Sequence, residues 1–498
     1  MKINPLLESD FYKQVHWNQY PKDVVKVVSY FTPRMSRLKN LKFATDQDKL
    51  IMFGLQSFIK EWLIEDFNEN FFNRDKAEVL KEADRLLDCT IQCNCGTYRF
   101  SELYDLGYLP IEIKALPEGT RVPVGCPMFE ISNTHPDFAW LTNALESRIS
   151  AELWHTMISA NVGYEYRKIV NEYYEKTVCG GAARKALGDF SMRGQESAAS
   201  AYKSSAAWLL SHVNTATVCA IPFLEKYYNC NCEDEEVGFG SASTEHSVMC
   251  SNFAVDGDED TMITRLLTEI YPYTSFSMVS DSYDYWDLVK NKLPKHKEEI
   301  LEHARHKNIM LIRGDSGDPV EVVTKTVFEL AKWWGYTVNN KGYKVLNFGL
   351  KAIYGDSITL TRIKEIYKIL EKEGWSVENV VLGVGSFSME CLEDGDKLYP
   401  YTRDTFGIAI KATHVVMKDG TEHFVFKNPK ESTFKKSHKG CCVVLENQNG
   451  LYCHDEMNFA DTYSPANRME VVFKDGKMVK EYSLKEVRER LWDGKFYE

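Results

Sequence analysis

The chain has 498 residues, of which 44% are hydrophobic and 27% charged, a balance that excludes a disordered or fibrous protein. Its 60 basic and 72 acidic residues give a formal charge of −12, which excludes a general nucleic-acid binder and leaves only local basic clusters for polyanions. The longest apolar runs are far shorter than a membrane-spanning helix, and the first residues, MKINPLLESD, lack the apolar segment of a secretion signal. We therefore expect a cytoplasmic protein with no membrane partner.

The two ends of the chain have the pattern of antiparallel strands. Residues 107–132 alternate apolar and polar positions between Pro and Gly, and residues 405–475 do the same, with turn signals at 418–420 and 447–450. Helical segments precede the first of these regions. We predict that residues 1–145 and 395–498 combine into one flanking α+β domain around a catalytic domain formed by residues 146–394.

Four β-type runs in the middle of the chain each end in a small or acidic cluster. They span residues 274–284, 308–319, 346–357 and 378–388, and Asp281, Asp315, Asp356 and Gly385 mark their ends at steps of 34, 41 and 29 residues. Each step has the length of a strand, a helix and two loops. The spacing thus predicts consecutive βα units.

The segments between these runs have helical periodicity. We expect Thr361 to cap one helix and Gly374 to end it, and Pro319 and Gly335 to bracket another. Strands alternating with helices predict a parallel sheet covered on both faces. An α/β barrel fits best, and an open doubly wound sheet is the alternative.

Both architectures place a site at the carboxyl ends of the strands. Asp281, Arg313, Asp315 and Asp356 fall there, where carboxylates can hold Mg²⁺ through water or bind sugar hydroxyls. The turn at 383–386, GVGS, follows a strand and could present backbone N–H groups to a phosphate.

A histidine and a run of basic residues add to this prediction. His246 follows a Gly-Ser-Ala-Ser loop, a context that favours catalysis over the structural role most histidines have. Basic residues are concentrated within 37 positions, and an anion-binding patch or a solvated lysine loop explains them equally well. They include Arg403, Lys411, Lys427, Lys430, Lys435, Lys436 and Lys439. Together these features suggest a substrate with more than one phosphate group and its Mg²⁺.

The thirteen cysteines, an odd number, are expected to be mostly free thiols in a reducing compartment. Cys89, Cys93 and Cys95 have the spacing C-x3-C-x-C, which differs from the pairs of a zinc ribbon, so we expect no metal site there. Cys441 and Cys442 lie in a strand-like run, CCVVL, and are expected to pack in the core.

Several longer motifs resemble the nicotinamide phosphoribosyltransferase family, in the family's order and over essentially the whole chain. They include DFYKQVHWNQYP, LGYLPIEIKALPEGT, GDFSMRGQES, STEHS, MVSDSYD, IRGDSGDP, YTRD and VFKDGKMVKEYSLKEVRERLW. The resemblance implies transfer of phosphoribose from 5-phosphoribosyl-1-pyrophosphate (PRPP) to nicotinamide, which gives nicotinamide mononucleotide and pyrophosphate in NAD salvage. It also implies a type II phosphoribosyltransferase barrel, a head-to-tail homodimer with active sites at the interface, Mg²⁺ carried with PRPP, and ATP as a co-substrate.

The same resemblance implies a role for each matching residue. Phe190 and Arg193 would frame the pyridine ring, with Tyr12 of the partner subunit on the other face, and Asp281, Arg313 and Asp315 would line the nicotinamide and ribose site. Gly355 and Asp356 would bind the ribose hydroxyls, and Gly385, Ser386 and Arg403 would bind the 5′-phosphate. The pyrophosphate would be bound by Lys411, Lys427 and Lys435, together with Arg34 of the partner subunit. His246 matches the histidine that ATP phosphorylates.

The sequence departs from the family pattern at three places. Asn214 stands where the family has an aspartate that accepts a hydrogen bond from the nicotinamide amide, so nicotinate remains an alternative substrate. An insertion occupies residues 390–401, and Gly314 replaces a common proline. A catalytically silent nucleotide-binding protein is a third hypothesis, which the intact set of site residues argues against.

Overall fold

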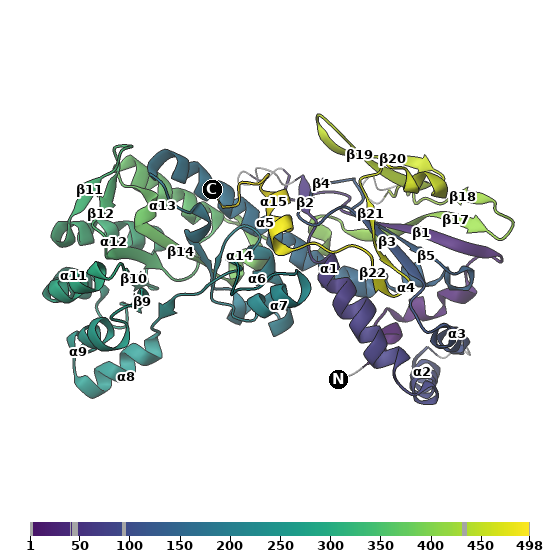
Figure 1. Ribbon diagram of the computed structural model, residues 1–498, viewed down its shortest axis with the longest axis horizontal. Helices are drawn as coiled ribbons and strands as arrows, with labels where there is room; N and C mark the ends of the chain where they lie inside the picture. Colours follow the sequence, from purple (N-terminus) through teal and green to yellow (C-terminus); the bar gives the residue numbers. More distant parts are fainter. Residues whose placement is uncertain (1–2, 40, 42–47, 92–95, 431–435, 498) are drawn as a thin grey trace. The chain divides into compact units, whose positions relative to one another are not determined.

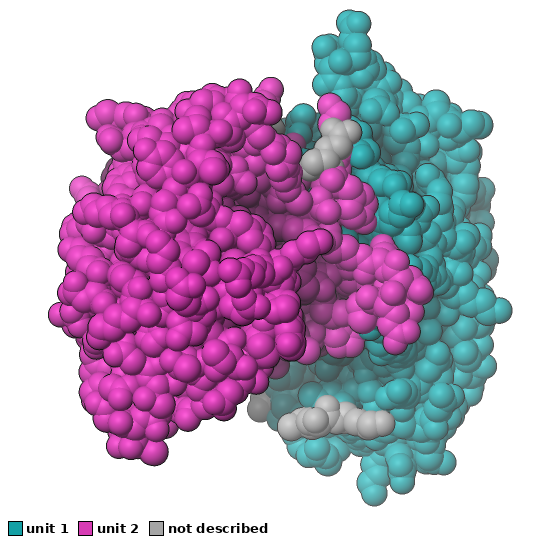
Figure 2. Space-filling view, turned by 60° about the vertical axis from the view of Figure 1, so that its left-hand side comes forward, with its two compact units in different colours: residues 1–161, 225–230, 401–494 teal, residues 162–224, 231–400, 495–498 magenta. Residues whose placement is uncertain are grey.

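The computed structural model describes residues 3–39, 41, 48–91, 96–430 and 436–497. The chain forms two compact units, which Figure 2 distinguishes by colour. Unit 1 comprises residues 1–161, 225–230 and 401–494, and unit 2 comprises residues 162–224, 231–400 and 495–498. Within the described residues, no helix is long and apolar enough to cross a membrane.

Unit 2 is built on a parallel sheet of seven strands in the order β7-β6-β14-β13-β10-β9-β8 (Figure 1). The strands are β6 (Leu187–Asp189), β7 (Asn214–Thr215), β8 (Ala242–Ser243), β9 (Phe276–Val279), β10 (Met310–Gly314), β13 (Leu350–Tyr354) and β14 (Val380–Val384). A parallel bridge between Asn214 and Phe239 joins β7 to the segment that leads into β8. The two edges of the sheet are thereby brought together, and the expected barrel-like α/β fold is confirmed.

Helices connect these strands: α6 (Ala198–Trp208), α7 (Ala220–Tyr227), α8 (His246–Asp256), α9 (Asp260–Arg265), α11 (Lys297–Arg305), α12 (Pro319–Trp334) and α13 (Leu360–Lys372). Helix α5 (Glu146–Thr177), whose first half belongs to unit 1, precedes the sheet, and α14 (Ser386–Glu390) follows its last strand. Asp318 caps α12 by accepting from the Glu321 N–H, and α12 ends before Gly335 as expected. The prediction that Thr361 caps α13 is wrong, because the Thr359 side chain accepts from the Arg362 N–H and the helix begins at Leu360, two residues earlier than predicted. The apolar face of α13, formed by Ile363, Ile366, Tyr367 and Leu370, is buried.

Unit 1 contains an antiparallel sheet to which both ends of the chain contribute. Its strands, in spatial order, are β18 (Glu422–Phe424), β17 (Ala409–Met417), β1 (Val24–Thr32), β5 (Phe129–Asn133), β3 (Ile111–Ala115), β21 (Glu470–Lys474) and β22 (Lys477–Met478). Two further pairs are β2 (Lys49–Ile51) with β4 (Arg121–Pro123), and β19 (Cys441–Asn447) with β20 (Gly450–Met457). The helices of this unit include α1 (Leu55–Phe58), α2 (Lys76–Thr90), α3 (Tyr98–Leu106), α4 (Leu141–Ala144) and α15 (Leu484–Leu491). The predicted α+β domain from both chain ends is thus confirmed.

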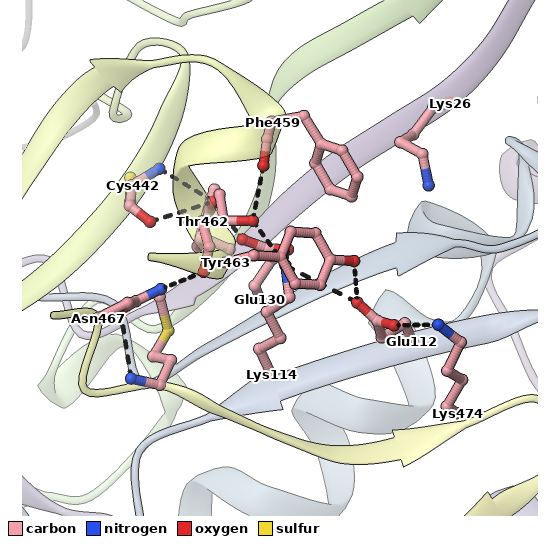
Figure 3. Close-up of polar contacts among 12 residues, drawn as sticks. Lys26, Glu112, Lys114, Glu130, Cys442, Phe459, Thr462, Tyr463, Asn467 and Lys474 are labelled. Atoms are coloured by element: carbon pink, nitrogen blue, oxygen red, sulfur yellow. Dashed lines mark hydrogen bonds and ion pairs between the residues drawn. The ribbon is translucent and has the colours of Figure 1, made fainter. Parts of the chain in front are cut away.

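A buried ionic network lies on this sheet (Figure 3). Lys114, which is 2% exposed, places its Nζ 3.2 Å from Glu130 Oε1 and 2.6 Å from the Thr462 hydroxyl. Tyr30 donates to Glu130 at 2.5 Å, and Lys474 lies 2.8 Å from Glu112. The buried carboxylates are therefore matched by cations and hydroxyl donors, which offsets the cost of desolvating them.

Candidate active site

Every strand of the parallel sheet delivers a predicted site residue at or just beyond its carboxyl end. The residues are Phe190 after β6, Asn214 in β7, His246 after β8, Asp281 after β9, Arg313 and Asp315 at β10, Gly355 and Asp356 after β13, and Gly385 and Ser386 after β14. Since parallel strands end at the same edge of a sheet, these side chains gather at one end of the barrel.

Four of these residues form a continuous chain of polar contacts. His246 Nε2 lies 3.1 Å from Asp281 Oδ1, and Asp281 Oδ2 accepts from the Asp315 N–H at 3.0 Å. Arg313 forms a two-point ion pair with Asp315, in which Nε donates to Oδ1 at 3.0 Å and Nη2 lies 2.7 Å from Oδ2. A bidentate ion pair of this kind fixes both side chains, so the guanidinium and the carboxylates have set positions.

The exposure of these groups differs in a way that matters for chemistry. The His246 side chain is 50% exposed, whereas that of Asp281 is 3% exposed. A buried carboxylate thus orients an accessible imidazole whose other nitrogen is free to meet a ligand. Burial, together with the negative charges of Asp315 and Asp281, raises the pKa of Tyr354 to about 12. This phenol, at the carboxyl end of β13, therefore stays neutral.

The glycines at the ends of β13 and β14 have no room for a side chain. A Cβ on Gly355 would lie 2.3 Å from Arg313 Nε and 2.4 Å from Asp315 Oδ1, and Gly355 donates its N–H to Asp315 at 3.1 Å. A Cβ on Gly385 would lie 1.8 Å from Asp356 Oδ1. The two turns therefore pack directly against the carboxylates of the site.

Phe190 and Asn214 meet over Gly188. A Cβ on Gly188 would lie 2.8 Å from the Phe190 ring and 3.3 Å from the Asn214 amide, which places the two side chains next to each other. The turn that carries Arg193 packs against Ser386, whose Oγ would lie 2.0 Å from a Cβ on Gly194. An aromatic ring and an amide thus lie side by side, and the turn that carries Arg193 lies against the Ser386 turn.

The sequence analysis missed Asp189, which holds this region together. Its fully buried carboxylate accepts from the Ser205 hydroxyl at 2.5 Å, the Thr215 hydroxyl at 2.9 Å and the Ser191 N–H at 2.9 Å. These bonds tie the Phe190 turn to β7 and α6. The only signal in the sequence was an aspartate at the end of an apolar strand, which does not distinguish a positioning residue from a ligand-binding one.

The remaining predicted residues lie on unit 1. Arg34 and Lys411 line one pocket of about 220 Å³, together with Tyr30, Thr32, Lys436 and His438. Lys427 is exposed and joined to the pocket wall by hydrogen bonds with Ser437, and Lys435 falls outside the described residues. Arg34 and Lys411 of one chain thus share a pocket, whereas the resemblance brings Arg34 to the pyrophosphate from the partner subunit.

Glu146, a second missed residue, organises the cations near this pocket. Its two carboxylate oxygens lie 3.0 Å from Lys411 Nζ and 2.8 Å from Lys13 Nζ. Burial favours the neutral acid, but the charges of Lys411 and Lys13 outweigh it and hold the pKa of Glu146 below its usual value. Tyr12 and Arg403 are exposed, and Tyr12 donates to Asp10 at 3.1 Å.

Two family models match the chain. The model of the nicotinate phosphoribosyltransferase (NAPRTase) family matches residues 186–477, and that of the nicotinamide phosphoribosyltransferase N-terminal domain matches residues 4–88. A nicotinamide phosphoribosyltransferase from Acinetobacter baylyi is 37% identical over 98% of this chain and 97% of its own length. One from Xanthomonas campestris pv. campestris is 28% identical over 97% of each chain.

Solved structures agree on the fold. The nicotinate-nucleotide pyrophosphorylase from Pyrococcus furiosus aligns with a TM-score of 0.56 at 13% identity, covering 98% of this chain and 95% of its own. Human nicotinic acid phosphoribosyltransferase aligns with a TM-score of 0.55, also at 13% identity, covering 98% and 93%.

Proposed function

This chain belongs to the nicotinamide phosphoribosyltransferase family, and we propose on that premise that it transfers phosphoribose from PRPP to nicotinamide, giving nicotinamide mononucleotide and pyrophosphate. The observation that carries the proposal is the arrival of a matching side chain or turn at the carboxyl end of all seven strands of the parallel sheet. Relatives of the same length that bear this name support the choice of substrate.

The reaction needs alignment more than proton transfer. The bond between ribose C1 and the pyrophosphate oxygen breaks with its electron pair on the leaving group, and the pyridine nitrogen forms the new bond with its own lone pair. No base is required to activate this nucleophile. The protein must hold nitrogen and C1 in line and stabilise the departing negative charge.

The residues of unit 2 suit these tasks. We propose that the Phe190 ring stacks on the pyridine and that Arg193, three residues further along the same turn, borders it. The Asp356 carboxylate can accept from ribose hydroxyls, while Gly385 and Ser386 offer backbone and hydroxyl donors to the 5′-phosphate. The oxygens of Asp281 and Asp315, which lie with the His246 nitrogen within 4.8 Å of one another, suit Mg²⁺ brought in by PRPP, whose charge would help to neutralise pyrophosphate.

The residues of unit 1 suit the anionic groups. We propose that Lys411, Lys427 and Lys435 bind the pyrophosphate with the partner subunit's Arg34, that Arg403 joins in binding the 5′-phosphate, and that the partner subunit's Tyr12 covers the second face of the pyridine ring. This arrangement requires a homodimer. A monomer that is fully active at all protein concentrations would contradict it.

We further propose that ATP phosphorylates His246, coupling ATP hydrolysis to synthesis. His246 is exposed and its Nε2 is held by Asp281, so Nδ1 can attack the γ-phosphorus of ATP while ADP leaves. Replacing His246 with Ala should abolish stimulation by ATP and leave slow ATP-independent synthesis. His306→Ala, at an exposed histidine beside Glu302, is the matched control and should change neither rate. If ATP still stimulates the His246→Ala variant, the role assigned to His246 is wrong.

Transfer to nicotinate is a second candidate, favoured by one observation. Asn214 lies beside Phe190, and its amide NH₂ could donate to a carboxylate where an aspartate would repel it. Comparing the two bases as substrates under the same conditions distinguishes the candidates.

A further inference from the structure

A cluster of soft ligands lies in unit 1, outside the site described above. One ring nitrogen of His438 and the Sγ atoms of Cys442 and Cys453 all lie within 4.8 Å of one another. All three belong to the β19–β20 hairpin or the segment that enters it, and both thiols are free. Cys442 is buried, whereas Cys453 and His438 are partly exposed, so an ion could reach them.

The strand register explains why the two thiols meet. Val444 pairs with Cys453, and Cys442 lies two residues away on the same face, which makes the cysteines diagonal neighbours. The pairing shifts between Cys441 and Val443, where β20 has one residue more than β19, so the bulge lies at Asp455 and Glu456 and leaves the two cysteines as diagonal neighbours. The Tyr30 hydroxyl accepts from the Cys442 N–H at 2.9 Å, which joins this backbone to the buried network of Figure 3.

His438 is oriented as a metal-binding histidine usually is. Its Nε2 lies 2.9 Å from the Gly125 carbonyl oxygen, which can accept only from an N–H, so a neutral His438 carries its lone pair on Nδ1. Nδ1 in turn lies 3.4 Å from Asp455 Oδ2. Two lone pairs facing each other at this distance are unfavourable unless a cation or a proton lies beside them.

We propose that His438, Cys442 and Cys453 bind a Zn²⁺ ion, with Asp455 beside a fourth position open to water. Two thiolates and an imidazole are ligands that Zn²⁺ prefers and that Mg²⁺ and Ca²⁺ do not. On binding, each S–H proton goes to solvent and each sulfur forms a bond to the metal. Bonds of about 2.3 Å to sulfur and 2.0 Å to nitrogen place tetrahedral ligand atoms roughly 3.5–3.8 Å apart, so the cluster needs to contract by at most about 1 Å.

The ion has a structural role next to the basic pocket. His438, Lys436 and Tyr30 all line the pocket that contains Arg34 and Lys411. A metal bond to His438 would fix the segment from Lys436 to His438 on the hairpin. The site therefore stabilises the pocket wall without touching the reacting atoms.

The test uses the full chain, reduced and freed of metal by a chelator, to which Zn²⁺ or Co²⁺ alone is added. We expect one ion per chain, a rise in Tm with Zn²⁺, and with Co²⁺ a thiolate charge-transfer band and intense tetrahedral d–d bands. His438→Gln and Cys453→Ser should each weaken binding at least about a hundredfold. The matched controls are His454→Gln, which points to the other face of the hairpin, and Cys179→Ser, an exposed thiol of unit 2, and both should bind normally.

A second measurement needs no variant. Zn²⁺ should protect the partly exposed Cys453 from alkylation in the native chain, as read by peptide mass spectrometry, and leave Cys179 reactive. The proposal is overturned if the wild-type chain gives no charge-transfer band. It is also overturned if the band persists in both ligand variants, or if Cys442 and Cys453 form a disulfide and the reduced chain binds no metal.

Discussion

Replacing Gly355 with Ala should disable the site without unfolding the protein. The new methyl group would lie 2.3 Å from Arg313 Nε and 2.4 Å from Asp315 Oδ1, whereas ordinary contacts begin near 3.4 Å. Both atoms belong to one ion pair, so the pair must move by about 1 Å as a unit. A misplacement of this size costs roughly a hundredfold in rate, or about 2.7 kcal/mol in transition-state stabilisation.

The assay is kcat/KM for mononucleotide formation with PRPP saturating, together with Tm. We expect kcat/KM to fall roughly a hundredfold, with a small change in Tm because the site is at the sheet edge. Gly163→Ala is the matched control, since its Cβ would make only an ordinary contact, 3.4 Å from Trp208 Cα, inside helix α5. Wild-type activity in Gly355→Ala would refute the assignment of the Arg313–Asp315 pair to catalysis.

Three further substitutions test other parts of the account. Lys114→Met removes the cation from a buried carboxylate, Glu130, and should lower the free energy of unfolding by about 3–5 kcal/mol in denaturant titrations; an unchanged midpoint would contradict the network. Burial raises the pKa of Glu118 from 4.5 to about 7, so the folded chain keeps a proton that the unfolded chain releases, and stability falls as pH rises through this window. The free energy of unfolding should fall by about 3 kcal/mol across this pH range, and the Glu118→Gln variant should lack this fall. Equal pH profiles of stability for the wild type and the variant would exclude Glu118 as the cause. Asn214→Asp should raise the ratio of nicotinamide to nicotinate turnover about tenfold or more, because a hydrogen bond from the nicotinamide amide to a charged carboxylate is worth ~1.5 kcal/mol. An unchanged ratio would place Asn214 outside the base pocket.

The sequence predicted four of the seven strands of the parallel sheet because their signals are local. Each of the four runs is apolar, is bounded by turn residues and ends in small or acidic residues, which the structure places at the carboxyl ends of the strands. Strands β9, β10, β13 and β14 all lie within these runs. The cap of α13 was misplaced because Thr359 and Thr361 have the same chemistry, and only the backbone geometry at Thr359 distinguishes them.

Contacts between distant segments could not be predicted in this way. Glu146 pairs with Lys13 and Lys411, which are 133 and 265 residues away, and no spacing rule connects them. Likewise, Cys442 was expected only to pack in the core, and it is indeed buried. Its approach to His438 and Cys453 depends on which residues of β19 and β20 pair and on the path of the segment before β19, which the residue pattern does not encode.

The most direct test of the central claim is a product assay with PRPP and Mg²⁺, in which nicotinamide and nicotinate are offered in parallel, each with and without ATP. The account predicts nicotinamide mononucleotide and pyrophosphate from nicotinamide, at a rate that ATP increases. Product from nicotinate alone would contradict the proposed base, and product from neither base would contradict the proposed activity altogether.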